Sequence, residues 1–311
     1  MPRRPRLFQP FVVYDVTVQT VDREFLLKPT PEIRNIVGAS LARAQRLFPI
    51  QFHYGLANVN HPHFGISAEP DQLDHIEPFF SLSLSLIARE TNRFWHRKGH
   101  LWASRAHIAP CVDDEKAEER LFYAMTNPQK DGLIDTLSQY PGFSTYAELA
   151  RGEPHKYFYF DRTAWWKQGG PCGEKSLEAF IEWVPLRVSP LPGWKNLTLP
   201  QQQTRFRKGL REREQAFREE RKKKSWPALG IKGLRELNPH DRPQTDRKRD
   251  VQPLCHASTI EAAEKYTQEY REIQSIRMAA SLSFREGNFA VEFPLGTFAP
   301  PLKSMYFASS L

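Results

Sequence analysis

Residues 50–68, IQFHYGLANVNHPHFGISA, contain two runs rich in apolar and aromatic residues, with Asn and Pro between them. Aromatic and β-branched side chains favour strands, whereas Asn and Pro are common in turns. We therefore predict two strands, Ile50–Val59 and Phe64–Ala68, joined at Asn58–Pro62.

A strand and a helix are predicted upstream of this pair. The run FVVYDVTVQT at Phe11–Thr20 is rich in β-branched residues, and Pro10 stands just before it. Pro31 suits the first turn of a helix, and apolar residues recur after it at helical spacing until Pro49. The order strand, helix, strand, strand is half of a ferredoxin-like sheet. The predicted fold class is therefore α+β, with a ferredoxin-like antiparallel sheet and helices on one face.

Two further helices are predicted downstream. Residues Asp71–Arg97 carry apolar side chains every three to four positions, which indicates a long helix. A second helix runs from Asp114 to about Thr126, and the carboxylates of its opening run DDEKAEE favour a helix N-terminus. Pro128 ends that helix within a turn.

The second half of the chain is less regular. HKYFYFDR and FIEWVPLRV are predicted strands, and the proline-rich run SPLPGWKNLTLPQQQ leads from them to charged helices. These patterns predict three parts: a main domain at 1–155, a strand-rich connector at 156–200, and a basic, mostly helical extension at 201–311.

The charge balance points to a polyanionic partner. The 311 residues include 44 Lys and Arg against 36 Asp and Glu, a net charge of +8, and nucleic acid is the usual partner of such a chain. Residues 205–224 alone hold ten basic and four acidic residues. With only Phe206, Leu210 and Phe217 as apolar anchors, this helix either clamps DNA or keeps the protein soluble.

Composition also bears on location. The apolar stretch Phe79–Ala88 is too short to cross a bilayer, and Asp15 interrupts the apolar part of the N-terminus, which argues against a secretory signal. Cys111, Cys172 and Cys255 stand singly, with neither a disulfide framework nor a zinc-binding pattern. We expect a cytoplasmic, nucleoid-associated protein without a membrane span.

His61-Pro62-His63 is the first candidate site. In an extended segment the period of two places both imidazoles on one face, where they can share a divalent metal ion. A solvated turn is the alternative, because Pro62 and the neighbouring Asn60 both form turns readily.

Tyr123 and Asn127 form the second candidate site. Four residues apart on a helix, the phenol and the amide carbonyl project from one face, which suits a nucleophile beside a metal ion. The alternative is a core aromatic residue at Tyr123 and a helix cap at Asn127.

Five blocks occur in an order and spacing that resemble one family: MPRRPRLFQPFVVYDVT, NHPHFGI, GHLWASR, YAMTNPQKDGLID and YPGFSTY. Over roughly residues 1–150 the chain is similar to the REP-associated tyrosine transposases, which are single-tyrosine HUH transposases. That family has the patterns Asn-His-hydrophobic-His, Gly-His-Leu-Trp and Tyr-x-x-x-Asn-Pro-x-x-x-Gly-Leu-Val.

The resemblance implies a ferredoxin-like HUH nuclease domain. In it, His61 and His63 hold Mg²⁺ or Mn²⁺, Asn127 completes the protein ligands, and Tyr123 attacks a DNA phosphodiester. Attack leaves a 5′-phosphotyrosine and a free 3′-hydroxyl, and reversal rejoins strands without ATP. The implied partner is single-stranded or hairpin DNA, bound by a monomer or a homodimer.

Pro62 departs from the family, which has a bulky hydrophobic residue between the two histidines. A second hypothesis follows: a domesticated DNA-binding protein that has lost cleavage. A relaxase or replication initiator would use the same chemistry, but the sequence blocks match transposases.

Basic residues in and beside these blocks are expected to contact DNA. Arg3, Arg4 and Arg6 lie on a proline-rich arm, which resembles the hairpin-contacting arm of the family. A flexible tail is the alternative. Arg93, Arg97 and Lys98 lie at the end of the predicted helix Asp71–Arg97, where a solvated helix end is the alternative. KYFYFDRTAWW at 156–166 either stacks unpaired bases or forms strand core. The predicted DNA contacts are Arg3, Arg4, Arg6, Arg93, Arg97, Lys98 and Arg105.

Overall fold

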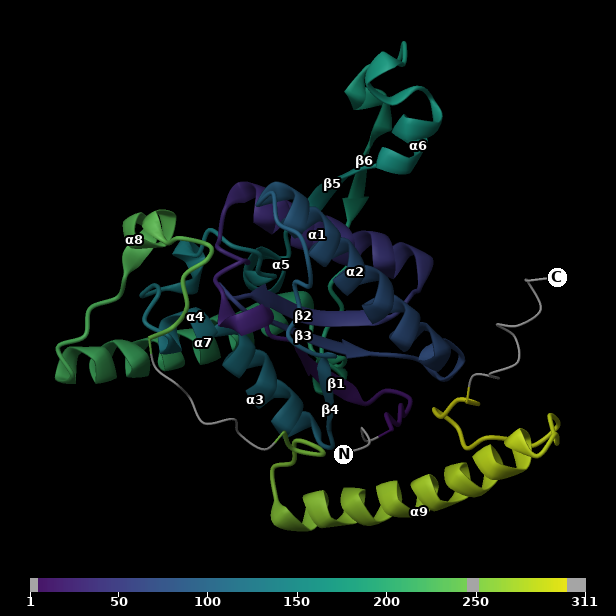
Figure 1. Cartoon of the computed structure of the whole chain (residues 1–311). Helices are drawn as coiled ribbons and strands as arrows, with labels where there is room; N and C mark the ends of the chain where they lie inside the picture. Colours follow the sequence, from purple (N-terminus) through teal and green to yellow (C-terminus); the bar gives the residue numbers. More distant parts are fainter. Residues whose placement is uncertain (1–4, 245–251, 301–311) are drawn as a thin grey trace.

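A four-stranded antiparallel sheet in the order β2-β3-β1-β4 forms the centre of the computed structural model, which describes residues 5–244 and 252–300 (Figure 1). Helix α1 (Pro31–Leu47) connects β1 to β2, and α2 (Ile76–Phe94) connects β3 to β4. The α+β class is therefore confirmed. The strands are β1 (Val13–Thr17), β2 (Gln51–Ala57), β3 (Pro62–Ser67) and β4 (His107–Cys111).

Three of these strands lie within or close to the predicted ranges, and the fourth was not predicted. Strand β1 is shorter than expected: it begins at Val13, after Phe11 with a φ of 62°. Strand β4 contains Pro110, which has no N–H for a ladder hydrogen bond. Because β4 lies at the edge of the sheet, the proline is tolerated there.

The helices begin where their caps place them. The Thr30 hydroxyl accepts a hydrogen bond from the Ile33 amide, just before Pro31 opens α1. Helix α2 starts later than predicted, because residues Pro70–His75 form a 3₁₀ turn. Helix α3 (Asp114–Met125) is capped by Asp113, whose carboxylate accepts from the Lys116 amide at 2.7 Å.

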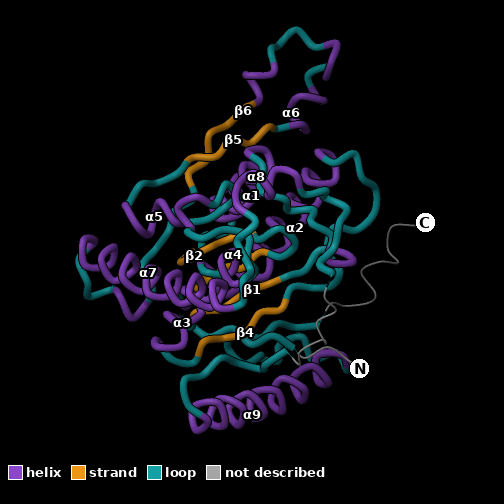
Figure 2. The backbone as a smooth tube through the Cα atoms, turned by 90° about the vertical axis from the view of Figure 1, so that its left-hand side faces the viewer, coloured by secondary structure: helices purple, strands orange, loops and turns teal. Residues whose placement is uncertain are grey.

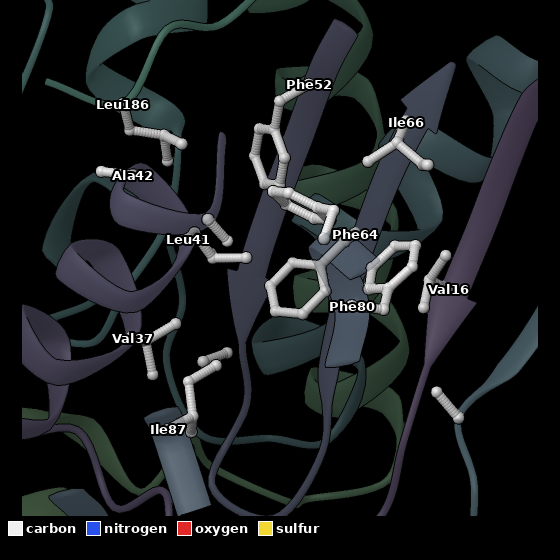
Figure 3. Packing of buried hydrophobic residues seen from close by; sticks show 14 of the residues in the cluster. Val16, Val37, Leu41, Ala42, Phe52, Phe64, Ile66, Phe80, Ile87 and Leu186 are labelled. Carbon is white, nitrogen blue, oxygen red and sulfur yellow. The ribbon is translucent and has the colours of Figure 1, made fainter. Parts of the chain in front are cut away.

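Both faces of the sheet are covered by helices, which corrects the prediction of helices on one face only. Strand alternation directs Phe64 and Ile66 of β3 into the apolar core under α1 and α2 (Figure 3). Helix α3 packs against all four strands from the opposite side. The alternating pattern of each strand predicts two faces but not which helix covers each of them.

Helix α7 (Leu199–Lys223) packs against this second side. The Phe206 ring stacks on Phe122 with centroids 5.9 Å apart, and Arg221 donates to the Gln129 carbonyl and to Asp135. One face of the helix is therefore part of the protein core, a role that neither sequence alternative included. The shorter helices nearby are α4 (Asn127–Lys130), α5 (Tyr146–Arg151) and α8 (Gly230–Glu236).

Strands β5 (Lys156–Phe160) and β6 (Ile181–Pro185) form a two-stranded ribbon that projects from the body and carries α6 (Arg162–Lys167) (Figure 1). Tyr157 and Val184 at its base are buried in the main core. Trp166 and Trp183 are exposed. The strand-core alternative for 156–166 therefore holds at the base of the ribbon, and base stacking by the exposed rings stays a prediction.

The C-terminal region covers the β4 edge of the sheet. The His256 carbonyl accepts from the Val112 amide at 2.9 Å, and the His256 amide donates to Pro110 at 2.7 Å. Helix α9 (Ile260–Arg285) then runs beside β4 (Figures 1 and 2). Within the described ranges, no helix is both long and apolar enough to cross a bilayer.

Candidate active site

The two predicted histidines lie at the start of β3 and face α3. His63 is buried, with 4% of its surface exposed, and His61 immediately precedes the strand. Their ring centroids are 5.0 Å apart and the rings are nearly perpendicular. The His61 Nδ1 lies 2.6 Å from the Asn60 side-chain oxygen, which orients that ring. The extended backbone therefore places both imidazoles together.

Helix α3 and the turn after it bring the other two predicted residues to the same place. The Tyr123 ring lies 5.6 Å from the His63 ring, edge to face. Asn127, which opens α4 after the break at Thr126, has its Nδ2 3.4 Å from the Nε2 of His63. The structure thus gathers all four predicted residues, although they come from two separate segments.

The Asn127 amide is held by a polar cluster. Its Oδ1 accepts a hydrogen bond from Asn58 Nδ2 at 2.5 Å, and the same Asn58 nitrogen donates to Asp131 at 2.8 Å. The nitrogen end of the amide therefore faces His63. A cation beside His63 would need the oxygen end, so binding requires the amide to turn over.

Burial keeps His63 in the form that binds metals. Loss of solvation lowers the pKa of His63 well below its ordinary value, and the positive charges of His61, Arg120 and Lys130 lower it further. The ring is then neutral at pH 7, and its buried Nδ1 has no hydrogen-bond partner. In the described part of the chain, no group of three or more His, Cys, Asp or Glu could hold a metal ion. A cation here would therefore have two imidazoles and an amide as protein ligands.

Two cations flank the Tyr123 ring. The Arg120 guanidinium lies 4.1 Å from the ring centroid, and the Lys130 ammonium lies 4.6 Å from it. Lys130 Nζ also donates to the Tyr123 hydroxyl at 3.3 Å. Both contacts place positive charge where a phenolate would form.

Sequence reasoning missed Arg120 and Lys130, and also Asp15, which binds Arg120 from β1. Arg120 stands one helical turn before Tyr123, so its spacing was a usable signal. For Asp15, the signal was a charged residue within a strand of otherwise apolar pattern. Nothing in the local sequence links Asp15 to Arg120.

The predicted DNA contacts fall into two groups. Arg6 and Arg105 both pair with Glu77 near the start of α2, at 2.8 and 2.7 Å. Arg93 pairs with Glu90 near the end of α2, about 20 Å away along the helix at 1.5 Å per residue.

Beyond α2, Arg97 donates to Asn92 and Lys98 is exposed. The structure therefore does not gather these residues into one patch. Arg3 and Arg4 lie outside the described residues.

Comparison with known proteins gives weak matches. No family model and no curated protein matches the sequence. A solved REP-associated tyrosine transposase bound to a REP hairpin is similar at a TM-score of 0.40 and 21% identity, over 49% of this chain and 87% of that one. A candidate transposase of Deinococcus radiodurans R1 is similar at a TM-score of 0.27 and 14% identity, over 38% of this chain and 93% of that one.

Proposed function

We propose that this chain is a transposase-like nuclease and strand transferase, which cuts and rejoins single-stranded hairpin DNA through a 5′-phosphotyrosine at Tyr123. One observation carries the proposal: the Tyr123 ring lies against His63, whose ring lies against His61. A hydroxyl nucleophile beside two imidazoles and an amide matches what metal-assisted phosphodiester cleavage requires.

The fold supports the same proposal. The order β-α-β-β-α-β with the sheet order β2-β3-β1-β4 fits a ferredoxin-like HUH domain. We assign residues 1–155 to this catalytic domain, 156–200 to a connector, and 201–311 to an extension.

We propose His61, His63 and Asn127 as the ligands of Mg²⁺ or Mn²⁺. The carbonyl oxygen of Asn127 suits such an ion. Nitrogen donors would come from His63, whose Nε2 lies beside the Asn127 amide, and from the neighbouring ring of His61. When bound, the ion would neutralise charge that develops on the scissile phosphate. Three protein ligands leave coordination positions open for that phosphate.

The chemistry of Tyr123 is an in-line displacement. The phenol gives its proton to solvent, and its oxygen forms a bond to phosphorus. The bond between phosphorus and the 3′-oxygen of the preceding nucleotide breaks, and that oxygen takes up a proton from solvent. Arg120 and Lys130 stabilise the negative charge on the phenol oxygen during attack. Rejoining is the reverse reaction, in which a 3′-hydroxyl displaces the tyrosine, so no ATP is consumed.

The end of α2 is the best candidate for contact with the DNA backbone near the site. The Thr20 amide donates to the Asn60 carbonyl, and the Val21 amide donates to Leu101. These bonds join the residue before His61 to the segment that follows α2. Arg97 and Lys98 therefore lie at the same end of the sheet as the histidines, where phosphate contacts would position the strand.

The second candidate is a DNA-binding protein that has lost cleavage, and Pro62 favours it. Pro62 is buried at the first position of β3, opposite Ala57, directly between the two histidines. Its fixed φ stiffens the backbone that carries them. Such stiffness would hinder the small adjustments that metal binding needs.

One experiment separates the two candidates. Labelled hairpin single strands are incubated with the protein and Mn²⁺, and denaturing gels are scored for a covalent adduct. The nuclease proposal expects an adduct that is absent in Tyr123→Phe and in EDTA. Tyr146→Phe is the matched control, because Tyr146 also has an arginine over its ring but lies outside the site. DNA binding without any adduct in the wild-type protein would favour the inactive candidate.

A further inference from the structure

A buried ion pair connects the central strand of the sheet to the side chain beside Tyr123. Asp15 on β1 is 1% exposed and faces α3. Its Oδ2 accepts from Arg120 Nη2 at 2.7 Å and from Nε at 3.2 Å. Its Oδ1 accepts from the Tyr54 hydroxyl at 3.0 Å. Both carboxylate oxygens are therefore used, and the guanidinium is held at two nitrogens.

The surrounding sheet is shaped for this contact. Gly65 pairs with Asp15 in the register of β1 and β3. A Cβ at Gly65 would lie 2.0 Å from the Tyr54 ring, so glycine leaves the space through which Tyr54 passes. The Tyr54 hydroxyl can then reach Asp15. The glycine, the phenol and the carboxylate form one unit.

The C-terminal extension closes the unit from the edge of the sheet. His256 Nε2 lies 3.7 Å from Asp15 Oδ2. Burial lowers the pKa of His256 to about 4, with Arg120 contributing, so the ring is neutral at pH 7. Burial is the largest influence and would lower the pKa of Arg120, but the charge and the hydrogen bond of Asp15, together with Tyr54 and Tyr123, raise that pKa above its ordinary value. Arg120 is thus the one cation that neutralises Asp15 at neutral pH among these contacts.

Stability alone does not explain a buried ion pair. Apolar residues of similar volume are often as stable as such a pair or more so, because two charges lose their hydration. The geometry points to another role. Arg120 is three residues before Tyr123 on α3, and its guanidinium lies over the Tyr123 ring at 4.1 Å. Without Asp15, the flexible arginine side chain would be free to turn toward solvent.

We propose that Asp15 and Arg120 are positioning residues for Tyr123: Asp15 fixes the guanidinium plane, and the guanidinium fixes the ring so that its hydroxyl meets the scissile phosphate. This inference rests on the proposed nuclease function. It assigns to β1 a part in orienting a nucleophile that α3 carries.

The test replaces the charged pair by a neutral one of similar shape, Asp15→Asn with Arg120→Gln. This double variant keeps hydrogen-bonding groups at both positions and leaves no unpaired charge. We expect the single-turnover rate of adduct formation to fall at least about 100-fold, the loss typical of a misplaced reacting group. Affinity for hairpin DNA, measured in EDTA, should stay within about twofold.

Arg213→Gln is the matched control. Arg213 lies 4.3 Å from the ring centroid of Phe122, the neighbour of Tyr123, but does not touch the site. The single-turnover rate of adduct formation by the Arg213→Gln variant should stay near that of the wild type. Arg120→Lys serves if the double variant does not fold: it keeps the charge, loses the planar stack, and should react about 10-fold more slowly. A wild-type rate in either folded variant would overturn the proposal.

A second measurement does not depend on cleavage. With 3-fluorotyrosine at position 123, ¹⁹F NMR of the metal-free, DNA-free protein should show separate signals for the two orientations of a restrained ring. In the double variant Asp15→Asn with Arg120→Gln, the ring should rotate freely, and the two signals should merge into one averaged signal. If the wild type forms no adduct but this change occurs, the nuclease function fails while the positioning contact stands. An identical spectrum in the variant would contradict the positioning role itself.

Discussion

The two faces of the central sheet use the same strands for different purposes. On β3, Phe64 and Ile66 enter the apolar core beneath α1 and α2, whereas His63 and Gly65 face α3. On β1, Val16 lies in that apolar core and Asp15 binds Arg120. One face holds the fold together by removing apolar surface from water. The other face also packs apolar side chains against α3, but around Asp15 and His63 it holds polar groups in place by hydrogen bonds and an ion pair.

This contrast teaches that a substitution should act on stability or on chemistry according to the face it alters. Adjacent residues on one strand can therefore have opposite effects. The following experiments compare such neighbours.

The largest effect is expected from His63→Gln on the α3 face. Glutamine keeps a polar side chain of similar length but removes the imidazole that we propose as a metal ligand. Adduct formation should fall to background, and binding of Mn²⁺, followed by calorimetry, should weaken. Cleavage by this variant at the wild-type rate would remove His63 from the proposed metal site.

Ile66→Ala tests the opposite face of the same strand. Ile66 is fully buried, so the truncation should lower the free energy of unfolding by about 2–5 kcal/mol. Urea denaturation measures this loss. Below the unfolding transition, the rate of adduct formation should change little. A loss of activity as severe as that of His63→Gln would break the proposed division between the faces.

Gly65→Ala should affect both properties, because the added methyl group would collide with the Tyr54 ring. Overpacking of this kind typically costs about 1–3 kcal/mol. The displaced Tyr54 should also disturb Asp15, so adduct formation should slow. Tyr54→Phe is the companion variant, since it keeps the ring and removes only the hydroxyl that donates to Asp15.

A comparison of buried carboxylates gives the smallest effect. Asp15 forms an ion pair with Arg120. Burial instead raises the pKa of the Glu148 carboxyl on α5 to about 7, although the charges of Arg34 and Arg151 lower it. Its ordinary value of 4.5 applies in the unfolded chain. The folded state therefore binds the extra proton between about pH 4.5 and 7, and stability falls as pH rises through that window.

Glu148→Gln should abolish this dependence. Relative to the wild type, the free energy of unfolding of the variant should be higher by about 1–3 kcal/mol at pH 8 and unchanged at pH 4. Thermal melts of the two proteins at both pH values, taken as differences, cancel the contributions of other groups. An equal gain at both pH values would show that Glu148 is not the titrating group.

The sequence predicted those elements whose signals are local. Strong periodicity and a proline at the first turn identified α1. Runs of apolar and aromatic residues on either side of Asn and Pro identified β2 and β3. Strand β4 was missed because it is five residues long and contains Pro110, which resembles a turn signal. Its edge position, which makes the proline acceptable, is a property of the assembled sheet.

The residues of the candidate site also differ in whether the local sequence could identify them. His61, His63, Tyr123 and Asn127 belong to two short motifs, so spacing and family resemblance selected them. Asp15 and Arg120 are 105 positions apart, and His256 comes from the far end of the chain. Only folding brings such residues together, and each has an ordinary local explanation on its own.

Peptide mapping of the DNA adduct tests the central claim most directly. The protein is reacted with a short hairpin single strand and Mn²⁺, digested with nuclease and trypsin, and analysed by mass spectrometry. We expect one modified peptide, with a nucleotide linked through its 5′-phosphate to the Tyr123 oxygen. A nucleotide on another residue, or cleavage of the hairpin without any covalent peptide, would contradict the account.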